Sequence, residues 1–305
     1  IKMDLKSKII LISGPTASGK SNFAANLAKK VKGEIINADS MQVYKELNIL
    51  TARPNLKQNN KIKHHLYGFL SIKKKFSTGQ WLKLASKKIK EIRNRNKIPI
   101  LVGGTGLYFK ALIDGLAKIP KISATKRKKV TNLQNKLGQI DFYKKLIKID
   151  PRIKNFVNSN DVHRSIRAYE VKYYTKKSLI EWYNDTRPPF SNEEFVKIYI
   201  DCPKDYLLDR IKVRTQKMFP KAIKEVKKIN SIKIPKSNSS TKIIGITEIE
   251  NFLDKKLNKA QTIEHIVIKT RQYAKRQATW ARGQMKDWKI ICSMNTKMSS
   301  KKLFN

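Results

Sequence analysis

The sequence predicts an α/β protein, with a P-loop NTPase-like parallel sheet as its core and an inserted, mostly helical domain. The apolar run Ile9–Ile12 leads into the pattern G-x-x-x-x-G-K-[ST] at Gly14–Ser21, and a helical segment follows. A second apolar run, Ile98–Val102, leads into another glycine-rich loop. Strand patterns disappear between about residues 119 and 191, where lysine-rich helical patterns with many aromatic residues replace them. These three observations define the core and the insert.

The expected domain boundaries follow from these changes in pattern. A chain of 305 residues is long enough for one large α/β core with an inserted second domain. We expect a first part of the core at 1–118, a helical insert at 119–192, a continuation of the core with a basic C-terminal helix at 193–292, and a disordered tail at 293–305.

The charge balance predicts a polyanionic partner. Lys and Arg number 67 against 23 Asp and Glu, a formal net charge of +44. Compositional drift toward lysine is one explanation, but it does not easily account for so few acidic residues. A field this positive favours nucleic acid first and an anionic membrane surface second.

Cysteine content and hydropathy predict the compartment. The two cysteines, Cys202 and Cys292, are too few for a disulfide framework, which indicates a reducing environment. The first apolar run is too short for a signal peptide, and no stretch approaches the roughly 20 apolar residues of a membrane span. We therefore expect a cytoplasmic protein without a membrane anchor, acting as a monomer.

The first glycine-rich loop predicts a phosphate site. Its glycines let successive backbone N–H groups turn inward toward an anion, and the helix that follows adds the positive end of its dipole. Lys20 supplies a full charge, and the Ser21 hydroxyl is the expected ligand of a Mg²⁺ cofactor that the phosphates also bind. The pattern indicates a diphosphate-like group without specifying ATP. The expected diphosphate-binding residues are Gly14, Thr16, Ala17, Ser18, Gly19, Lys20 and Ser21.

Two polar residues follow other predicted strands. Asp39 follows the strand predicted at Glu34–Ala38, and Thr105 lies in the glycine-rich loop after Ile98–Val102. Parallel α/β sheets carry their chemistry at the carboxyl ends of strands, so both residues are candidates for the site. Asp39 is equally well explained as a helix cap and Thr105 as part of a tight turn.

Hydrophobic periodicity predicts the remaining elements. Another strand, Phe195–Ile200, ends at Asp201, which we interpret as part of a strand-to-helix turn and not as a metal ligand. We expect segment 230–242 to be a mobile loop because it is rich in Ser, Asn and Lys. The predicted helices are Asn22–Val31, Trp81–Asn94, Tyr108–Leu116, Lys204–Met218 and Lys259–Gly283.

Several motifs together resemble one family. In order, they are GPTASGKS (14–21), DSMQVY (39–44), TARP (51–54), HHL (64–66), LVGGTGLYFKAL (101–112), the ND-x-x-R-x-x-R-A-x-E run (160–170) and TRQYAKRQATWARG (270–283). The set resembles the tRNA dimethylallyltransferases, also called tRNA isopentenyltransferases, over about residues 9–290. The resemblance implies a P-loop-type core with an inserted helical domain.

The resemblance also implies a reaction. Family members transfer a dimethylallyl group from dimethylallyl diphosphate to the exocyclic amine of the adenine 3′ of the tRNA anticodon, position 37. The Asp that opens DSMQVY acts as the base, a role carried over to Asp39. Thr105 matches the GGT threonine near the reacting groups. Arg214, with Arg210 as second choice, is the arginine expected to stabilise the leaving diphosphate.

The resemblance implies tRNA contacts in three places, namely the loop after Asp39, the insert and the C-terminal helix. In the insert, Arg164 and Arg167 are three residues apart on one helix face, which alone fits a solvated surface or a phosphate contact equally well. The expected tRNA-binding residues are Asp39, Ser40, Met41, Gln42, Arg127, His163, Arg164, Ser165, Ile166, Arg167, Arg271, Lys275, Arg276 and Gln277.

Three positions depart from the family pattern. Leu50 stands where a glycine is common, Lys63 where a proline is common, and Ile246 where an aromatic residue usually follows Gly245. None of the three belongs to the expected catalytic set.

Other functions share parts of this pattern. A prenyltransferase acting on free adenine nucleotides would have the phosphate loop and the DS and GGT motifs, but it needs neither a basic insert nor a charge of +44. A small-molecule kinase or an NTP-driven RNA-binding protein would share the phosphate loop alone. A binding module without catalysis would leave Asp39 and Thr105 beside that loop unexplained.

Overall fold

The computed structural model describes residues 7–55, 62–232, 234–235 and 238–295. The chain forms two compact units, unit 1 (Ile1–Ile113 with Phe190–Asn305) and unit 2 (Asp114–Pro189), which are treated separately below. Across the described residues, no helix is both long and apolar enough to cross a membrane.

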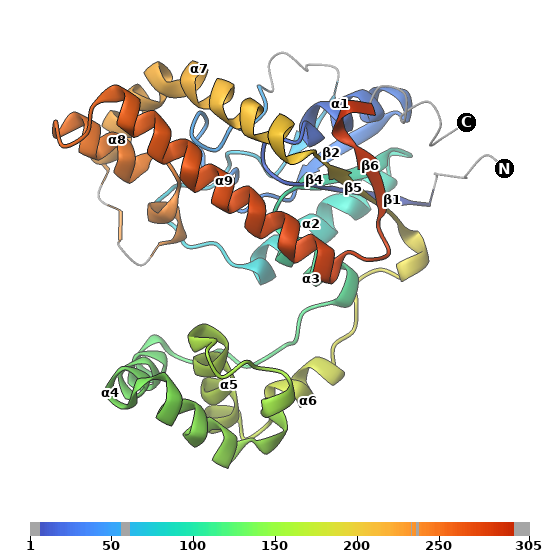
Figure 1. Cartoon of the computed structure of the whole chain (residues 1–305). Coiled ribbons are helices and arrows are strands. Elements are labelled where there is room, and N and C mark those ends of the chain that lie inside the picture. Colours follow the sequence, from blue (N-terminus) through green and yellow to red (C-terminus); the bar gives the residue numbers. More distant parts are fainter. Residues whose placement is uncertain (1–6, 56–61, 233, 236–237, 296–305) are drawn as a thin grey trace. The chain divides into compact units, whose positions relative to one another are not determined.

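Unit 1 is built on a parallel sheet (Figure 1). Within the described residues it has six strands in the order β3-β2-β4-β1-β5-β6. Strand β1 lies centrally between β4 and β5, with Leu11 paired to Leu101 on one side and to Lys197 on the other. The strands are β1 (Ile9–Ser13), β2 (Gly33–Asn37), β3 (His64–His65), β4 (Ile98–Gly103), β5 (Phe195–Asp201) and β6 (Lys289–Cys292).

Helices cover both faces of this sheet, which explains the continuous apolar character of its central strands. Alternate residues of β1 point to opposite faces, so that Ile9 and Leu11 belong to one hydrophobic cluster and Ile10 and Ile12 to another. All four side chains are fully buried, and each such burial contributes about 2 kcal/mol. The helices of unit 1 are α1 (Lys20–Lys30), α2 (Thr78–Arg93), α3 (Gly106–Asp114), α7 (Lys204–Asn230), α8 (Ile246–Leu253) and α9 (Lys259–Gln284).

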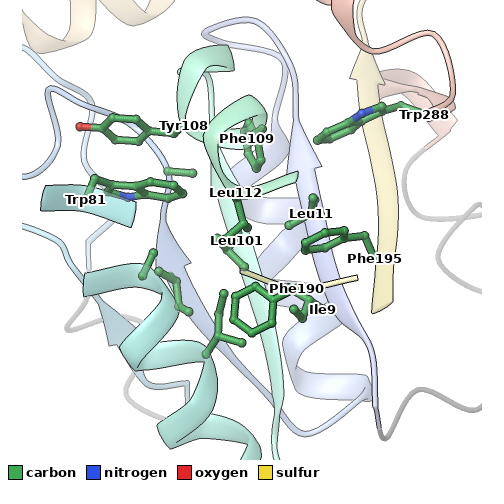
Figure 2. Packing of buried hydrophobic residues seen from close by; sticks show 14 of the residues in the cluster. Ile9, Leu11, Trp81, Leu101, Tyr108, Phe109, Leu112, Phe190, Phe195 and Trp288 are labelled. Carbon is green, nitrogen blue, oxygen red and sulfur yellow. The ribbon is translucent and has the colours of Figure 1, made fainter. Parts of the chain in front are cut away.

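Aromatic residues fill the face covered by α2 and α3 (Figure 2). Trp81 stacks on Tyr108 at 4.3 Å between ring centroids, and its indole N–H donates to the carbonyl of Asn37 at 2.8 Å. Phe109 meets Trp288 edge to face at 5.3 Å. The fully buried Trp81 therefore ties α2 to the end of β2, just before Asp39.

Helix α7 is longer than the sequence predicted. The predicted helix ends at Met218, two residues before Pro220, a residue that lacks an N–H and disfavours a helix interior. The helix nevertheless continues to Asn230 with Pro220 inside it. Phe219, Ala222, Val226 and Ile229 are buried along one face of this second half, and their packing outweighs the single lost hydrogen bond.

Two further expectations need correction. Part of the predicted mobile loop 230–242 is packed, since Asn238 and Ser240 are buried and donate side-chain hydrogen bonds to the carbonyl of Ile72. The predicted disordered tail begins too early, because Ser293–Asn295 form a short 3-10 helix, whereas residues 296–305 lie outside the described part. Strands β3 and β6 were not predicted, since each is short and carries polar residues.

Unit 2 is helical and has its own hydrophobic core. Phe142 and Leu146 are fully buried and pack with Ala168 and Tyr169. Within helix α4, Gly138 has a φ of 73° and a ψ of 170°, a positive-φ conformation that glycine tolerates, and the helix bends there. The elements of unit 2 are α4 (Ala124–Ile149), the 3-10 helix Pro151–Asn155, α5 (Val162–Thr175) and α6 (Leu179–Asn184).

Candidate active site

The loop between β1 and α1 forms a phosphate cradle. Gly19 has a φ of 88° and stands at the N-terminus of α1, and Ala17 has a φ of 66°. A Cβ on Gly14 would lie 2.7 Å from the carbonyl oxygen of Ile200, so only glycine lets the loop start this close to β5. The Lys20 ammonium donates back to the Pro15 carbonyl at 3.1 Å. The loop therefore has the curled backbone that a diphosphate site requires.

Two arginines of α7 hold this loop from the side. The Arg210 Nε donates to the Ala17 carbonyl at 2.7 Å, and an Nη1 of Arg214 donates to the Thr16 hydroxyl at 3.2 Å. The Nε of Arg214 is buried, and no described residue accepts its hydrogen bond. A buried guanidinium N–H without an acceptor is costly, so an anion bound here would satisfy it.

The charges of this cluster have shifted pKa values. Burial lowers the pKa of Lys20 to about 8, with Asp39 acting in the opposite direction and Arg214 adding to the decrease. Burial also lowers the pKa of Arg214, and the nearby Arg210 contributes. Desolvation and mutual repulsion both disfavour these positive charges, and both penalties shrink when an anion binds.

Asp39 lies directly after β2 with one carboxylate oxygen available. Its Oδ1 accepts from the Met41 N–H at 2.9 Å, whereas no described residue donates to Oδ2. Its backbone N–H donates to the Asn37 side chain at 2.8 Å. No helix begins here among the described residues, so the helix-cap interpretation is wrong. The Met41 bond closes a local turn through one carboxylate oxygen, and the other oxygen remains available to accept a proton.

Three tyrosines lie within electrostatic range of the Asp39 carboxylate. Burial raises the pKa of Tyr67, Tyr108 and Tyr273, and the negative charge of Asp39 raises each one further. These phenols therefore stay neutral at ordinary pH.

Thr105 supports the Asp39 loop. Its hydroxyl oxygen accepts from the Ser40 N–H at 3.0 Å, and its own N–H donates to the Ala38 carbonyl at 3.3 Å. Asp39 lines a cavity next to the phosphate loop, whereas Thr105 is not among the described residues that line it. The structure thus gives Thr105 a contact to the residue after Asp39.

A cavity of about 1140 Å³ joins these groups. Its polar wall includes Lys20, Ser21, Asp39, Arg210 and Arg214, so the loop, the carboxylate and the α7 arginines face one space. Its apolar wall is formed by Ile49, Leu50, Val213, Met218, Ile244 and Ile266. A ligand with an anionic head and a short hydrocarbon group fits this division between polar and apolar walls.

The sequence analysis did not identify the apolar wall or Glu225. This carboxylate on α7 accepts hydrogen bonds from the backbone N–H groups of Asn48, Ile49 and Leu50 at 2.6, 2.8 and 2.8 Å. It therefore anchors the segment that supplies two apolar wall residues. The spacing of Arg210, Arg214, Met218, Lys221 and Glu225 along one helix face could have revealed it, had the predicted helix not ended at Met218.

A Mg²⁺ ion fits the donors in this cavity. The described residues contain no cluster of three His, Cys, Asp or Glu side chains that could hold a metal unaided. Mg²⁺ keeps several waters and often binds one protein oxygen together with substrate phosphates. Ser21 lines the cavity beside Lys20, and its hydroxyl is the candidate for that protein oxygen.

The tRNA-binding residues predicted in the Asp39 loop and on α9 include both exposed and inward-pointing side chains. Met41 packs on an apolar cluster, whereas Gln42 lines the cavity and donates to the Thr51 carbonyl at 3.0 Å. On α9, Arg271, Lys275 and Arg276 are exposed. Gln277 points inward instead, accepting from the Thr16 N–H at 2.8 Å and donating to the Gly104 carbonyl at 3.0 Å.

The tRNA-binding residues predicted in unit 2 also include both exposed and buried side chains. His163 and Arg164 are exposed at the start of α5, which Asp161 caps. Arg127 is exposed, and its Nε lies 4.0 Å from the Glu170 carboxylate, which also accepts from Arg167 at 3.4 Å. Ser165 is fully buried and accepts from Gln139, and Ile166 packs against the core, so neither side chain is open to a ligand.

The fold and this cavity define an α/β protein of the P-loop type, in which a phosphate cradle and a carboxylate line one cavity. The sequence profile described as IPP transferase matches residues 42–284. This match covers more than half of the chain, and the chain belongs to the IPP transferase family, as the ordered motifs predicted.

Relatives and solved structures agree with this assignment. The chain is 56% identical to the tRNA dimethylallyltransferase of Pelagibacter ubique over 94% of this chain and 92% of that protein. It is 43% identical to that of Rickettsia canadensis, over 92% and 87%. The crystal structure of a tRNA isopentenylpyrophosphate transferase from Bacillus halodurans is similar at a TM-score of 0.70 with 30% identity, covering 97% and 95% of the two chains. A eukaryotic dimethylallyltransferase acting on tRNA has a TM-score of 0.80 with 28% identity, covering 94% and 74%. The predicted fold class is therefore confirmed.

Proposed function

We propose that this chain transfers a dimethylallyl group from dimethylallyl diphosphate to the exocyclic amine of adenine 37, immediately 3′ of the anticodon in tRNA, and releases diphosphate. The observation that carries the proposal is the single cavity shared by the phosphate cradle, Asp39 and an apolar wall. The family relatives are named for this reaction, which links the cavity to a donor and an acceptor.

The donor occupies the cradle with its diphosphate on Lys20 and Arg214 and its hydrocarbon on the apolar wall. Leaving diphosphate gathers negative charge as the allylic C–O bond breaks, and the two cations and the loop N–H groups stabilise that charge. The buried Nε of Arg214 gains an acceptor in this arrangement. Cations and apolar residues that line one cavity account for both parts of the donor.

Asp39 takes the proton from the acceptor amine. An exocyclic adenine amine is a weak nucleophile because its lone pair is delocalised into the ring, so its N–H must be lost as the new C–N bond forms. The free Oδ2 of Asp39 accepts that proton while Met41 holds the other oxygen. Thr105 keeps the loop in place through Ser40.

Mg²⁺ is the proposed cofactor, held by the Ser21 hydroxyl and the donor phosphates. When bound, it supplies positive charge to the departing diphosphate.

The acceptor is tRNA, with its target base unstacked so that the amine reaches the cavity. Exposed Arg271, Lys275 and Arg276 on α9, and Arg127 and Arg164 in unit 2, supply cations for phosphate contacts. The net charge of +44 supports a long polyanionic partner over a free nucleotide. We place the reaction in the cytoplasm, with the tRNA pool, and we propose that the chain acts as a monomer.

A paired assay tests the proposal. Purified protein, Mg²⁺ and labelled dimethylallyl diphosphate are incubated with unmodified tRNA carrying A37, or with AMP. Label on tRNA alone, mapped to A37, is the expected result. Label on AMP alone would transfer the activity to free nucleotides, and label on neither would reject the prenyltransferase assignment.

The partner is tested separately by the salt dependence of tRNA binding. If about six phosphates are contacted, affinity falls about a thousandfold between 50 and 200 mM salt. A flat response would show that the charge does not serve tRNA binding.

A further inference from the structure

Gln277 lies between the two loops that form the donor site. Its side chain comes from α9, yet it contacts the first glycine-rich loop at Thr16 and the second at Gly104. The basic residues just before it, Lys275 and Arg276, are exposed, whereas Gln277 is partly buried. Successive side chains of a helix point about 100° apart. Neighbouring residues of one basic motif therefore face solvent at Lys275 and Arg276 and the loops at Gln277.

The chemistry of these two contacts requires an amide. The Thr16 N–H can only donate, at 2.8 Å, and the Gly104 carbonyl can only accept, at 3.0 Å. Glutamine has both an acceptor and a donor at its tip, so its oxygen must face Thr16 and its nitrogen must face Gly104. Glu offers no donor when ionised, and Lys or Arg offers no acceptor.

The second glycine-rich loop is shaped to receive α9. A Cβ on Gly104 would lie 2.1 Å from the Gln277 Nε2, and a Cβ on Gly106 would lie 2.2 Å from the Trp280 ring. A Cβ on Gly103 would lie 2.0 Å from the Ala38 carbonyl oxygen. The glycines therefore allow close approach of α9 on one side and of the segment before Asp39 on the other.

We propose that Gln277 is a positioning residue of the donor site, which sets the phosphate cradle relative to the loop that supports Asp39. Thr16 is then held from two helices, by Gln277 from α9 and by Arg214 from α7. The next residue after Gly104 is Thr105, whose hydroxyl oxygen accepts from the Ser40 N–H. Gln277 therefore also supports the loop that carries Asp39. This inference rests on the proposed function and changes the expected role of Gln277 from tRNA contact to donor-site geometry.

The test measures binding of inorganic pyrophosphate with Mg²⁺ by calorimetry, with no tRNA present. Gln277→Met keeps the side-chain length and removes both hydrogen bonds, and we expect its dissociation constant for pyrophosphate to rise about tenfold. Gln272→Met, the same substitution at an exposed position of α9, is the matched control and should leave that constant within about twofold. Unchanged pyrophosphate binding by Gln277→Met, with a normal unfolding temperature, would overturn the proposal.

Two further readouts separate positioning from tRNA contact. Gln277→Met should raise the KM for dimethylallyl diphosphate about tenfold and leave tRNA affinity within about threefold. Lys275→Gln should instead lower the salt slope of tRNA binding by about one. Selective loss of tRNA affinity in Gln277→Met would assign the residue to tRNA and reject the positioning role.

Gln277→Glu provides a rescue by pH. An ionised carboxylate can accept from Thr16 but cannot donate to Gly104, whereas the protonated form can do both. Its pyrophosphate affinity relative to wild type, compared at each pH, should therefore recover as pH falls, and a constant ratio would contradict the proposal. Failure of the proposed function appears elsewhere, as wild-type protein that transfers no label to tRNA.

Discussion

Units 1 and 2 use their polar residues differently. In unit 1 the cations at the site are partly buried and bonded to backbone, as Arg210 is to Ala17 and Lys20 to Pro15. In unit 2 Arg164 and Arg127 are exposed, and their nearest acids lie 3.5 and 4.0 Å away. Desolvated groups interact strongly and over short distances, whereas solvated charges act weakly and are screened by salt. We therefore expect large, salt-independent effects from unit 1 and small, salt-dependent effects from unit 2.

The largest expected effect comes from Asp39. Asp39→Asn removes the proton acceptor but can keep the Met41 contact through its amide oxygen. Turnover should fall about 10²–10⁴-fold in single-turnover label transfer, with tRNA and pyrophosphate binding nearly unchanged. Asp209→Asn, at an exposed carboxylate in the same cavity, should change turnover less than about threefold. Equal losses in the two variants would show that Asp39 acts through general charge and is not the base.

The second effect concerns Lys20 and pH. Because burial lowers its pKa to about 8, Lys20 loses its positive charge as pH rises through that value, and pyrophosphate binding should weaken. At one pH unit above the pKa the dissociation constant should be about tenfold higher than its low-pH value. Lys20→Arg keeps its charge and serves as the reference at each pH, which removes the ionisation of pyrophosphate itself. If both proteins show the same pH profile, Lys20 does not control binding in this range.

The third effect concerns Glu225, which anchors two residues of the apolar wall and is not among the described residues that line the cavity. Glu225→Ala leaves three backbone N–H groups without their acceptor and releases the segment that carries Ile49 and Leu50. The KM for dimethylallyl diphosphate should rise about tenfold, while pyrophosphate, which lacks the hydrocarbon, should bind within about threefold of wild type. Lys224→Ala, on an exposed neighbour, is the control. A larger loss for pyrophosphate than for the full donor would contradict this division of the cavity.

The smallest effect belongs to unit 2. Arg164→Gln removes one exposed cation whose ion pair with Asp161 contributes little to stability. Its tRNA affinity should fall several-fold, and the slope of log affinity against log salt should decrease by about one. Lys144→Gln changes an exposed lysine of α4 beside Asp141. It tests whether the loss of any exposed positive charge lowers the salt slope in the same way. Identical slopes for Arg164→Gln and wild type would place Arg164 outside the tRNA contact.

Local sequence signals were sufficient for much of unit 1. Apolar runs located β1, β2, β4 and β5, because a strand covered on both faces must be apolar throughout. The phosphate loop was recognisable because its glycines and lysine are adjacent in the chain. Strand β3 was missed because its two residues are histidines, and the second half of α7 was missed because Pro220 is a strong local signal against a helix.

The sequence by itself determined the α/β class, the phosphate loop, the family and the candidates Asp39 and Arg214, because each depends on residues close together in the chain or on an ordered set of motifs. Only the tertiary structure decided how distant residues meet. It joined Glu225 to Asn48 and Gln277 to Thr16, separated by 177 and 261 residues, and it buried Ser165 directly after the exposed Arg164. Hydrogen bonds and burial depend on packing of helices against the sheet, and local patterns do not encode which side chains that packing brings together.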